Sequence, residues 1–219
     1  MSANTKPFLV RLVRYVIKNP RYSLERLSII VGQKLRGLET YKNVRQADLN
    51  IPQSAEPVLY ESSGNSFLVK TLKNLNITSN DSIIDFGCGK GGALIKMANF
   101  PFKKIVGVEY SEFLYKIAQK NIKKLKLHHI QLFQGDAAAF KDLDDINYVY
   151  LFNPFGLATL HPVLENIKKS LKNNPRDLTL IYKNAVHHQA VINSGLFKKI
   201  NQFKGENADF FIYKTIPKS

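Results

Sequence analysis

The chain has 219 residues, of which 44% are hydrophobic and 22% are charged, and this composition is typical of a globular protein with one main domain and an appendage. Its single cysteine, Cys88, excludes an internal disulfide bond and a cysteine-rich zinc site. Such cysteine usage is compatible with a reducing cytoplasm, where we expect the protein to be located.

The chain is strongly basic, with a net charge of +15. Its first 46 residues hold ten basic residues and two acidic ones, so about half of the excess lies in the first fifth of the chain. This excess is typical of a surface for an anionic partner, such as nucleic acid, anionic lipid or an acidic protein. A general lysine bias, with solvated lysines on the outer faces of helices, explains it equally well, and both interpretations stay open.

Residues 1–46 have the pattern of two basic amphipathic helices, and Asn19-Pro20 ends the first of them. The apolar run over residues 8–17 is too short and too interrupted by arginine to span a bilayer, and it lacks the cleavage site of a signal peptide. Two uses of this extension stay open. We favour a lid across the following domain over a helix at a membrane surface.

The next segments lead to a glycine-rich turn. Residues 47–66 are linker-like, and a helix is expected over residues 67–75. Residues 82–86 have the pattern of a buried strand, and residues 93–98 continue at helical spacing. The glycines between them let the backbone take positive φ and approach a ligand, and the free N–H groups at the helix start form a polar site.

The glycine spacing fits two kinds of cofactor site. Gly87-x-Gly89-x-x-Gly92 matches the dinucleotide-binding pattern, and Glu109 lies about twenty residues further on, where a ribose-binding acid is expected. The same stretch also fits an acidic residue, Asp85, followed by three alternating glycines. The glycines alone do not separate the two alternatives.

Strands and helices alternate through the rest of the chain. The expected strands cover residues 104–108, 130–134, 148–152 and 178–182, and the expected helices cover residues 111–124, 161–171 and 185–193. This alternation predicts a mostly parallel sheet with helices on both faces. Two final strands, 197–202 and 209–215, are joined by a short turn and must therefore be antiparallel.

Four polar side chains come at or just after the ends of successive strands: Asp85, Glu109, Asp136 and Asn153. In an open α/β sheet, ligands bind beyond the carboxyl ends of the strands. Three carboxylates there suit S-adenosylmethionine, which carries a sulfonium and an ammonium group and no phosphate. They would serve a pyrophosphate poorly, and little chain is left for the second domain of a dehydrogenase.

The motifs after four successive strands form one ordered set: Asp85-x-Gly87-x-Gly89-x-Gly91, Glu109, Gly135-Asp136-Ala137 and Asn153-Pro154-Phe155. Over roughly residues 60–216 the chain resembles class I (seven-stranded, Rossmann-like) S-adenosylmethionine-dependent methyltransferases, and it is most similar to small bacterial members of unassigned substrate. The resemblance implies an α/β fold with a doubly wound, mostly parallel seven-stranded sheet that ends in an antiparallel hairpin. Residues 67–219 would form this domain, residues 47–66 would cover the cofactor, and residues 1–46 would be a helical appendage.

The resemblance implies a set of residues that bind S-adenosyl-L-methionine: Tyr60, Glu61, Asp85, Gly87, Gly89, Glu109, Tyr110, Asp136 and Ala137. Tyr60 and Glu61 would lie at the methionine end of the cofactor. The backbone of the glycine turn would pass this end, and Asp85 would reach the ammonium group. Glu109 would accept both ribose hydroxyls, and the tyrosine after it would stack beside the adenine. Asp136 would accept from the adenine amine, and the Ala137 N–H would donate to a ring nitrogen. For each acid, a helix cap or a surface charge is the alternative.

The loop Asn153-Pro154-Phe155 resembles the Asn-Pro-Pro-aromatic loop of methyltransferases that act on amino groups. There, the Asn oxygen and a proline carbonyl accept the hydrogens of the amine, and the aromatic ring stacks on the acceptor. This chain has one proline in place of two, so the resemblance favours a nitrogen acceptor and leaves adenine specificity open. A plain Asn-Pro turn is the alternative.

A second motif, Tyr182-x-Asn184-x-x-His187, follows the strand at 178–182, as in the small bacterial methyltransferases. His187 is a candidate for taking the proton that an acceptor loses. No spacing of histidines and acids indicates a metal site, and this chemistry needs none.

The leading hypothesis is therefore an S-adenosylmethionine-dependent enzyme that methylates a nitrogen of a protein side chain or of a small molecule. An RNA or DNA N-methyltransferase is the first alternative, supported by the net charge. The second alternative is a non-catalytic protein that binds the cofactor or a membrane surface through its basic helices. The methyl acceptor and the oligomeric state are left open.

Overall fold

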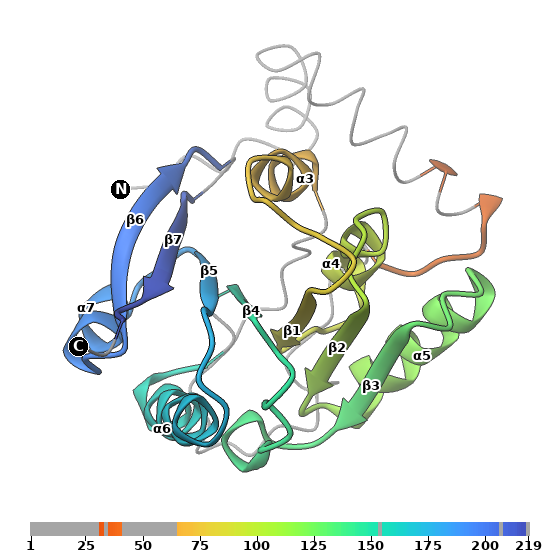
Figure 1. Ribbon diagram of the computed structural model, residues 1–219. Helices are drawn as coiled ribbons and strands as arrows, with labels where there is room; N and C mark the ends of the chain where they lie inside the picture. Colours follow the sequence, from red (N-terminus) through yellow and green to blue (C-terminus); the bar gives the residue numbers. More distant parts are fainter. Residues whose placement is uncertain (1–30, 33–34, 41–64, 153–154, 206–207, 218–219) are drawn as a thin grey trace, which may run out of the picture. The chain divides into compact units, whose positions relative to one another are not determined.

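A computed structural model of the chain describes residues 31–32, 35–40, 65–152, 155–205 and 208–217 (Figure 1). The chain divides into two units, Met1–Glu39 and Thr40–Ser219. In the first unit, Leu35 belongs to a helix and is 83% exposed. The segment around the expected boundaries at 46 and 66 lies mostly outside the described residues, so those domain boundaries stay predictions.

The second unit is built on a seven-stranded sheet in the order β3-β2-β1-β4-β5-β7-β6. Its strands are β1 (Ser82–Phe86), β2 (Lys104–Glu109), β3 (Ile130–Gln134), β4 (Tyr148–Phe152), β5 (Thr179–Lys183), β6 (Phe197–Phe203) and β7 (Phe210–Thr215). The first five are parallel, and β7 pairs antiparallel with both β5 and β6. The predicted fold class, including the antiparallel hairpin at the end, is confirmed.

Helices cover both faces of this sheet (Figure 1). They are α3 (Ser66–Lys73), α4 (Gly92–Met97), α5 (Glu112–Lys124), the 3₁₀ turn η2 (Ala137–Ala139), α6 (Leu157–Asn173) and α7 (His188–Asn193). Side chains of α3, α4 and α5 form one core cluster with the sheet, and those of α6 and α7 form the other. None of the helices among the described residues is long and apolar enough to cross a membrane.

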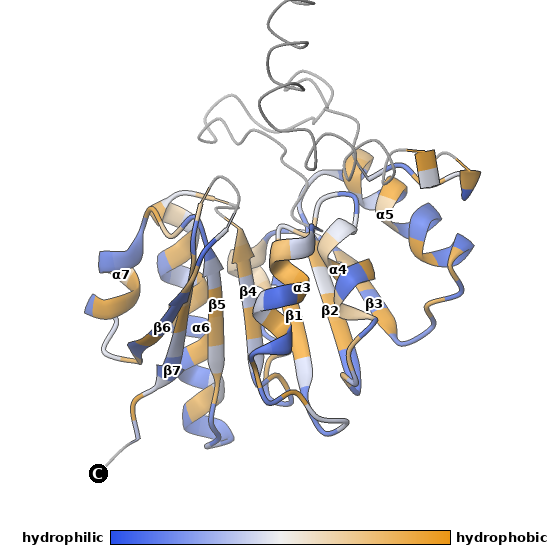
Figure 2. Cartoon of the chain, turned by 90° about the horizontal axis from the view of Figure 1, so that it is seen from above, coloured by the Kyte–Doolittle hydropathy of each residue, from blue (hydrophilic) through white to orange (hydrophobic). Residues whose placement is uncertain are grey.

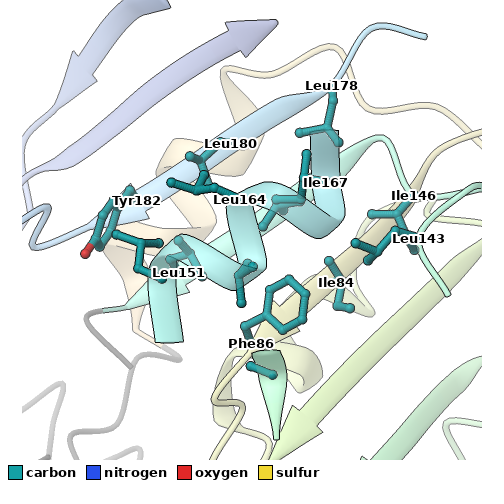
Figure 3. Packing of buried hydrophobic residues seen from close by; sticks show 14 of the residues in the cluster. Ile84, Phe86, Leu143, Ile146, Leu151, Leu164, Ile167, Leu178, Leu180 and Tyr182 are labelled. Atoms are coloured by element: carbon teal, nitrogen blue, oxygen red, sulfur yellow. The ribbon is translucent and has the colours of Figure 1, made fainter. Parts of the chain in front are cut away.

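The two cores follow from the alternation of side chains along the strands. In β1, Ile84 and Phe86 point to the α6 side, where they pack near Leu164 and Ile167 (Figure 3). Ile83 belongs to the other cluster. The central strands are apolar along most of their length (Figure 2), as expected for parallel strands that are buried on both faces.

Helix α6 begins before the predicted start at residue 161. The N–H groups of Thr159 and Leu160 bind the carbonyl of Gly156, so the first turn closes ahead of Pro162, which lies inside the helix. Helix α7 is shorter than predicted, since its first residue is His188. Asn65 caps helix α3: its side-chain oxygen accepts from the Leu68 N–H at 3.1 Å.

We expect Gly107→Val to lower the free energy of unfolding by about 1–3 kcal/mol. A Cβ atom at Gly107 in β2 would lie 2.6 Å from Leu94 Cδ1 and 2.9 Å from both Cys88 Sγ and Leu132 Cδ2. Urea denaturation measures the change. Gly32→Ala is the control, because nothing lies within 4 Å of that added carbon. Equal stability of Gly107→Val and the wild type would show that helix α4 moves away freely.

Candidate functional site

The glycine turn after β1 is tightly wound. Gly87, Gly89 and Gly91 have φ of 78°, 55° and 80°, a conformation that favours glycine. The N–H groups of Gly87 and Cys88 both bind the carbonyl of Val108, at 2.8 and 3.1 Å, and so tie the turn to the neighbouring strand β2. At these three glycines, no side chain shields the backbone at the carboxyl edge of the sheet, so a ligand can approach it closely.

The carboxylate of Glu109, the last residue of β2, stabilises this turn through hydrogen bonds. One carboxylate oxygen accepts the Gly89 N–H and the other accepts the Ser111 N–H, each at 2.8 Å. Only 6% of the residue is exposed. Burial raises the pKa of Glu109, while the backbone hydrogen bonds act in the opposite direction. Each oxygen has further acceptor capacity, so the carboxylate can hold the turn and still accept from two ligand hydroxyls.

Asp85 lies inside β1, one residue before its end, and only 2% of it is exposed. Its Oδ2 atom has no hydrogen-bond partner among the residues that the structure describes. Burial, and then the negative charge of Glu109, raise the pKa of Asp85 well above its usual range. Burial and both carboxylates also raise the pKa of the Cys88 thiol. A carboxyl group with one unpartnered oxygen beside a second carboxyl group fits a positively charged ligand, and the ammonium group of S-adenosylmethionine is such a ligand.

Asp85→Asn is expected to stabilise the ligand-free protein at pH 8 by about 1–3 kcal/mol. Because the pKa of Asp85 is raised on folding, the folded state keeps a proton that the unfolded chain has released above about pH 4. The free energy of unfolding of the wild type therefore falls as the pH rises from about 4 toward the raised pKa of folded Asp85. The asparagine side chain of Asp85→Asn does not titrate, so the variant does not lose this stability. Urea denaturation at pH 5 and pH 8 measures it.

The matched control for that experiment is Asp136→Asn, an exposed acid. We expect its effect on stability to be the same at both pH values. If the gain from Asp85→Asn were equal at pH 5 and pH 8, the Asp85 carboxyl would not titrate differently in the folded and unfolded states.

The predicted adenine-binding residues lie after β2 and β3. Asp136 is exposed, and its Oδ1 accepts the Ala138 N–H at 2.8 Å, so that this oxygen caps η2. Ala137 is buried, and Tyr110 is 47% exposed. Asp136 is therefore a cap, which is the alternative that the sequence left open for this acid. The second carboxylate oxygen of Asp136 is compatible with a ligand contact.

The predicted acceptor residues are only partly described. Tyr60, Glu61, Asn153 and Pro154 lie outside the described residues. Phe155 is half-buried and packs against the core cluster on the α6 side.

His187 is half-buried at the start of α7, and its backbone contacts the Tyr182 hydroxyl. Burial raises the pKa of Tyr182 to about 12. The next residue, His188, places Nδ1 2.8 Å from the Tyr213 hydroxyl. This histidine therefore anchors α7 to β7.

Three residues at the same edge were missed from the sequence. Asn121, on the buried face of α5, donates its amide to the Lys90 carbonyl at 3.0 Å and so fixes the glycine turn. A signal for it exists, because Asn121 interrupts the apolar face of a helix. Lys90 and Lys183 are 0% and 3% exposed, whereas the lysines expected to be solvated are those on the outer faces of helices. Lys183 continues the apolar run of β5, which is a weak signal for a buried lysine.

Comparisons with known proteins agree with this geometry. A family model described as "Methyltransferase domain" matches residues 77–206, more than half of the chain. A Methanococcus maripaludis protein described as "Probable cobalt-precorrin-6B C(15)-methyltransferase (decarboxylating)" is 27% identical over 142 residues, covering 64% of this chain and 70% of that protein. A Methanocaldococcus jannaschii protein described as "Putative protein N5-glutamine methyltransferase" is 36% identical over 103 residues, covering 47% and 50%.

Solved structures share the fold. A methyltransferase of Aquifex aeolicus, described as SAM-dependent, superposes with a TM-score of 0.57 at 14% identity, covering 68% of this chain and 89% of that one. An RNA methyltransferase of Salinibacter ruber, solved with S-adenosyl-L-homocysteine, gives a TM-score of 0.52 at 17% identity, covering 69% and 94%.

Proposed function

We propose that this chain, which belongs to the methyltransferase-domain family and uses S-adenosylmethionine, transfers the methyl group to a nitrogen atom of a protein side chain or of a small molecule. The cofactor supplies, when bound, a methyl group on a positively charged sulfur. The residues of this chain have to hold that donor, exclude water and aim the lone pair of the acceptor.

The observation that carries the proposal is the pairing of β1 with β4, the two strands that precede the glycine turn and the expected acceptor loop. Strand β4 lies between β1 and β5, and the register pairs Phe86 with Leu151, so β1 and β4 end side by side. The glycine turn leaves β1 directly after that pair, and Asn153-Pro154 follows Phe152 on β4. Donor and acceptor motifs thus start from neighbouring strand ends.

On this proposal, Asp85 attracts the donor's ammonium group and Glu109 accepts from its ribose, while Tyr60 and Glu61 cover the methionine end. Tyr110, Asp136 and Ala137 contact the adenine, and the backbone of Gly87 and Gly89 passes the methionine part. Asn153 accepts a hydrogen of the acceptor amine, the Pro154 carbonyl accepts another, and Phe155 stacks on the acceptor. His187 takes the proton that the methylated nitrogen loses. The 36% identity to the relative described as an N5-glutamine methyltransferase supports nitrogen as the acceptor.

Transfer of a tritium-labelled methyl group tests this function. Labelled S-adenosylmethionine is incubated with the protein and with separate protein, RNA and metabolite extracts, and the labelled products are analysed for N-methyl groups. We expect label on nitrogen in the protein or metabolite fraction. Label on carbon would contradict the proposal and would favour an activity like that of the relatives described as precorrin methyltransferases.

Methylation of RNA or DNA nitrogen is the second candidate, and the net charge of +15 favours it. Binding to nucleic acid through phosphate contacts falls steeply with salt concentration. Fluorescence anisotropy with labelled RNA at 50 and 200 mM salt therefore tests this candidate. Binding that is weak and insensitive to salt would count against it.

A further inference from the structure

Helix α5 lies beside β3, the strand at one edge of the sheet (Figure 1). From residue 113 to residue 135, the chain contains five lysines and two histidines and no acidic residue. All five lysines are exposed. On α6, by contrast, the two signs are mixed, and Glu165 pairs with Lys168 at 3.5 Å. Positive charge is therefore concentrated at the α5 end of the sheet.

Three of these lysines form one stripe along α5. Lys116, Lys120 and Lys123 follow Phe113 at intervals of three, seven and ten residues, so the four side chains lie on one face of the helix. The opposite face of α5 is buried. At about 1.5 Å per residue, the stripe is about 15 Å long. A stacked strand of nucleic acid has a phosphate about every 3.4 Å, so about four phosphates fit along the stripe.

An exposed aromatic ring begins the stripe. Phe113 lies in the first turn of α5 and is 43% exposed. The helix begins at Glu112, three residues after Glu109, so this end of the stripe is the one nearer the candidate site. Bases of an unpaired strand stack on exposed aromatic rings, whatever their sequence.

The composition of the stripe distinguishes between anionic partners. Lysine is depleted at protein–protein interfaces, so three lysines in one row disfavour an acidic protein. A helix that binds a membrane surface inserts an apolar face, whereas the apolar face of α5 is buried. A row of positive charges with an aromatic ring is typical of grooves that bind single-stranded nucleic acid.

We propose that the outer face of α5 binds a single strand of nucleic acid: the three lysines of the stripe contact consecutive phosphates, and Phe113 stacks on a base at the end near the candidate site. Contacts of these two kinds do not distinguish RNA from DNA or one sequence from another. The inference goes beyond the proposed function and does not rest on it, because binding of the strand requires neither the cofactor nor a methyl acceptor.

Fluorescence anisotropy with a labelled single strand of about 15 nucleotides, measured without cofactor over a range of salt concentrations, tests the proposal. The test variant combines Lys116→Gln, Lys120→Gln and Lys123→Gln. Each phosphate contact of a single strand contributes about 0.7 to the slope of log affinity against log salt concentration, so the slope should fall by about 2. At about 100 mM salt, the affinity should fall by about 10- to 100-fold.

Phe113→Ala tests the stacking contact separately. It removes no charge, so the slope against salt concentration should stay that of the wild type. The affinity should fall by about 5- to 100-fold, as expected when one base loses its aromatic partner. Wild-type affinity in Phe113→Ala would overturn the assignment of this ring to a base.

The matched control combines Lys168→Gln, Lys169→Gln and Lys172→Gln, which remove the same charge from exposed positions on α6. This control should bind the strand as the wild type does. Every variant is made in the full chain, so that the basic extension is the same in each, and urea denaturation verifies that each variant is folded.

Three results would overturn the proposal. The first is wild-type affinity and slope in the α5 variant. The second is an equal loss in the α5 and α6 variants, which would show attraction by net charge alone. The third is binding of the wild type to vesicles of anionic lipid and not to the strand. Strand binding that depends on α5 would support the proposal even if labelled methyl transfer failed, so the two proposals fail separately.

Discussion

Replacement of Asn153 by alanine is expected to lower methyl transfer by about 10²- to 10³-fold while the affinity for S-adenosylmethionine stays the same. Asn153 directly follows β4 in the sequence, and the described end of β4 pairs with that of β1. Its proposed contact is with the acceptor amine, whose lone pair it would aim. The proposed donor contacts come from other residues and do not involve this side chain. Labelled transfer measures the rate, and calorimetry measures cofactor affinity.

Asn80→Ala is the matched control for Asn153→Ala, because Asn80 is exposed and precedes β1 at the opposite end of the strand. Its transfer rate should equal that of the wild type. A parallel loss of transfer and cofactor affinity in Asn153→Ala would instead identify a structural Asn-Pro turn, which is the alternative that the sequence left open.

Glu109→Ala is expected to weaken binding of S-adenosylmethionine by about 2–3 kcal/mol, or about 30- to 150-fold. On the proposed contacts, two ribose hydroxyls lose their charged acceptor. In addition, the N–H groups of Gly89 and Ser111 lose their partner, so the glycine turn becomes less ordered. Calorimetric titration measures the affinity, and urea denaturation separates it from the stability of the fold.

An exposed acid provides the comparison for Glu109. Glu112 lies in the first turn of α5 and pairs with Lys116 on the surface. Glu112→Ala should bind the cofactor as the wild type does. Wild-type affinity in Glu109→Ala would show that its carboxylate only holds the turn and does not touch the ligand.

Most of the strand pattern could be predicted from the sequence, because short apolar runs ended by turn residues define it. Strands β3 and β4 have the predicted bounds. Strand β5 is shifted by one residue, since it includes Lys183, and the expected strand ended with the last apolar residue before this lysine. The start of α6 was missed because Gly156 caps it without a side-chain hydrogen bond.

The sequence predicted which acidic residues lie at the candidate site, but it did not predict the hydrogen bonds that hold the glycine turn in place. The order of Asp85, Glu109 and Asp136 at or after the ends of successive strands predicts a common edge once the sheet is parallel. The parallel pairing of these strands is confirmed, and the ligand contacts stay a prediction. Which donors a carboxylate binds depends on turn geometry, so the bonds of Glu109 to Gly89 and Ser111 could not be predicted. The same holds for the amide of Asn121, which reaches across from another element.

A crystal structure of the protein with S-adenosylhomocysteine tests most directly the claim that this edge holds the methyl donor. The account predicts both ribose hydroxyls within hydrogen-bond distance of the Glu109 carboxylate, with the amino-acid end over Gly87 and Gly89 beside Asp85. A nucleoside bound elsewhere, or one at this edge with no contact to Glu109, would contradict it.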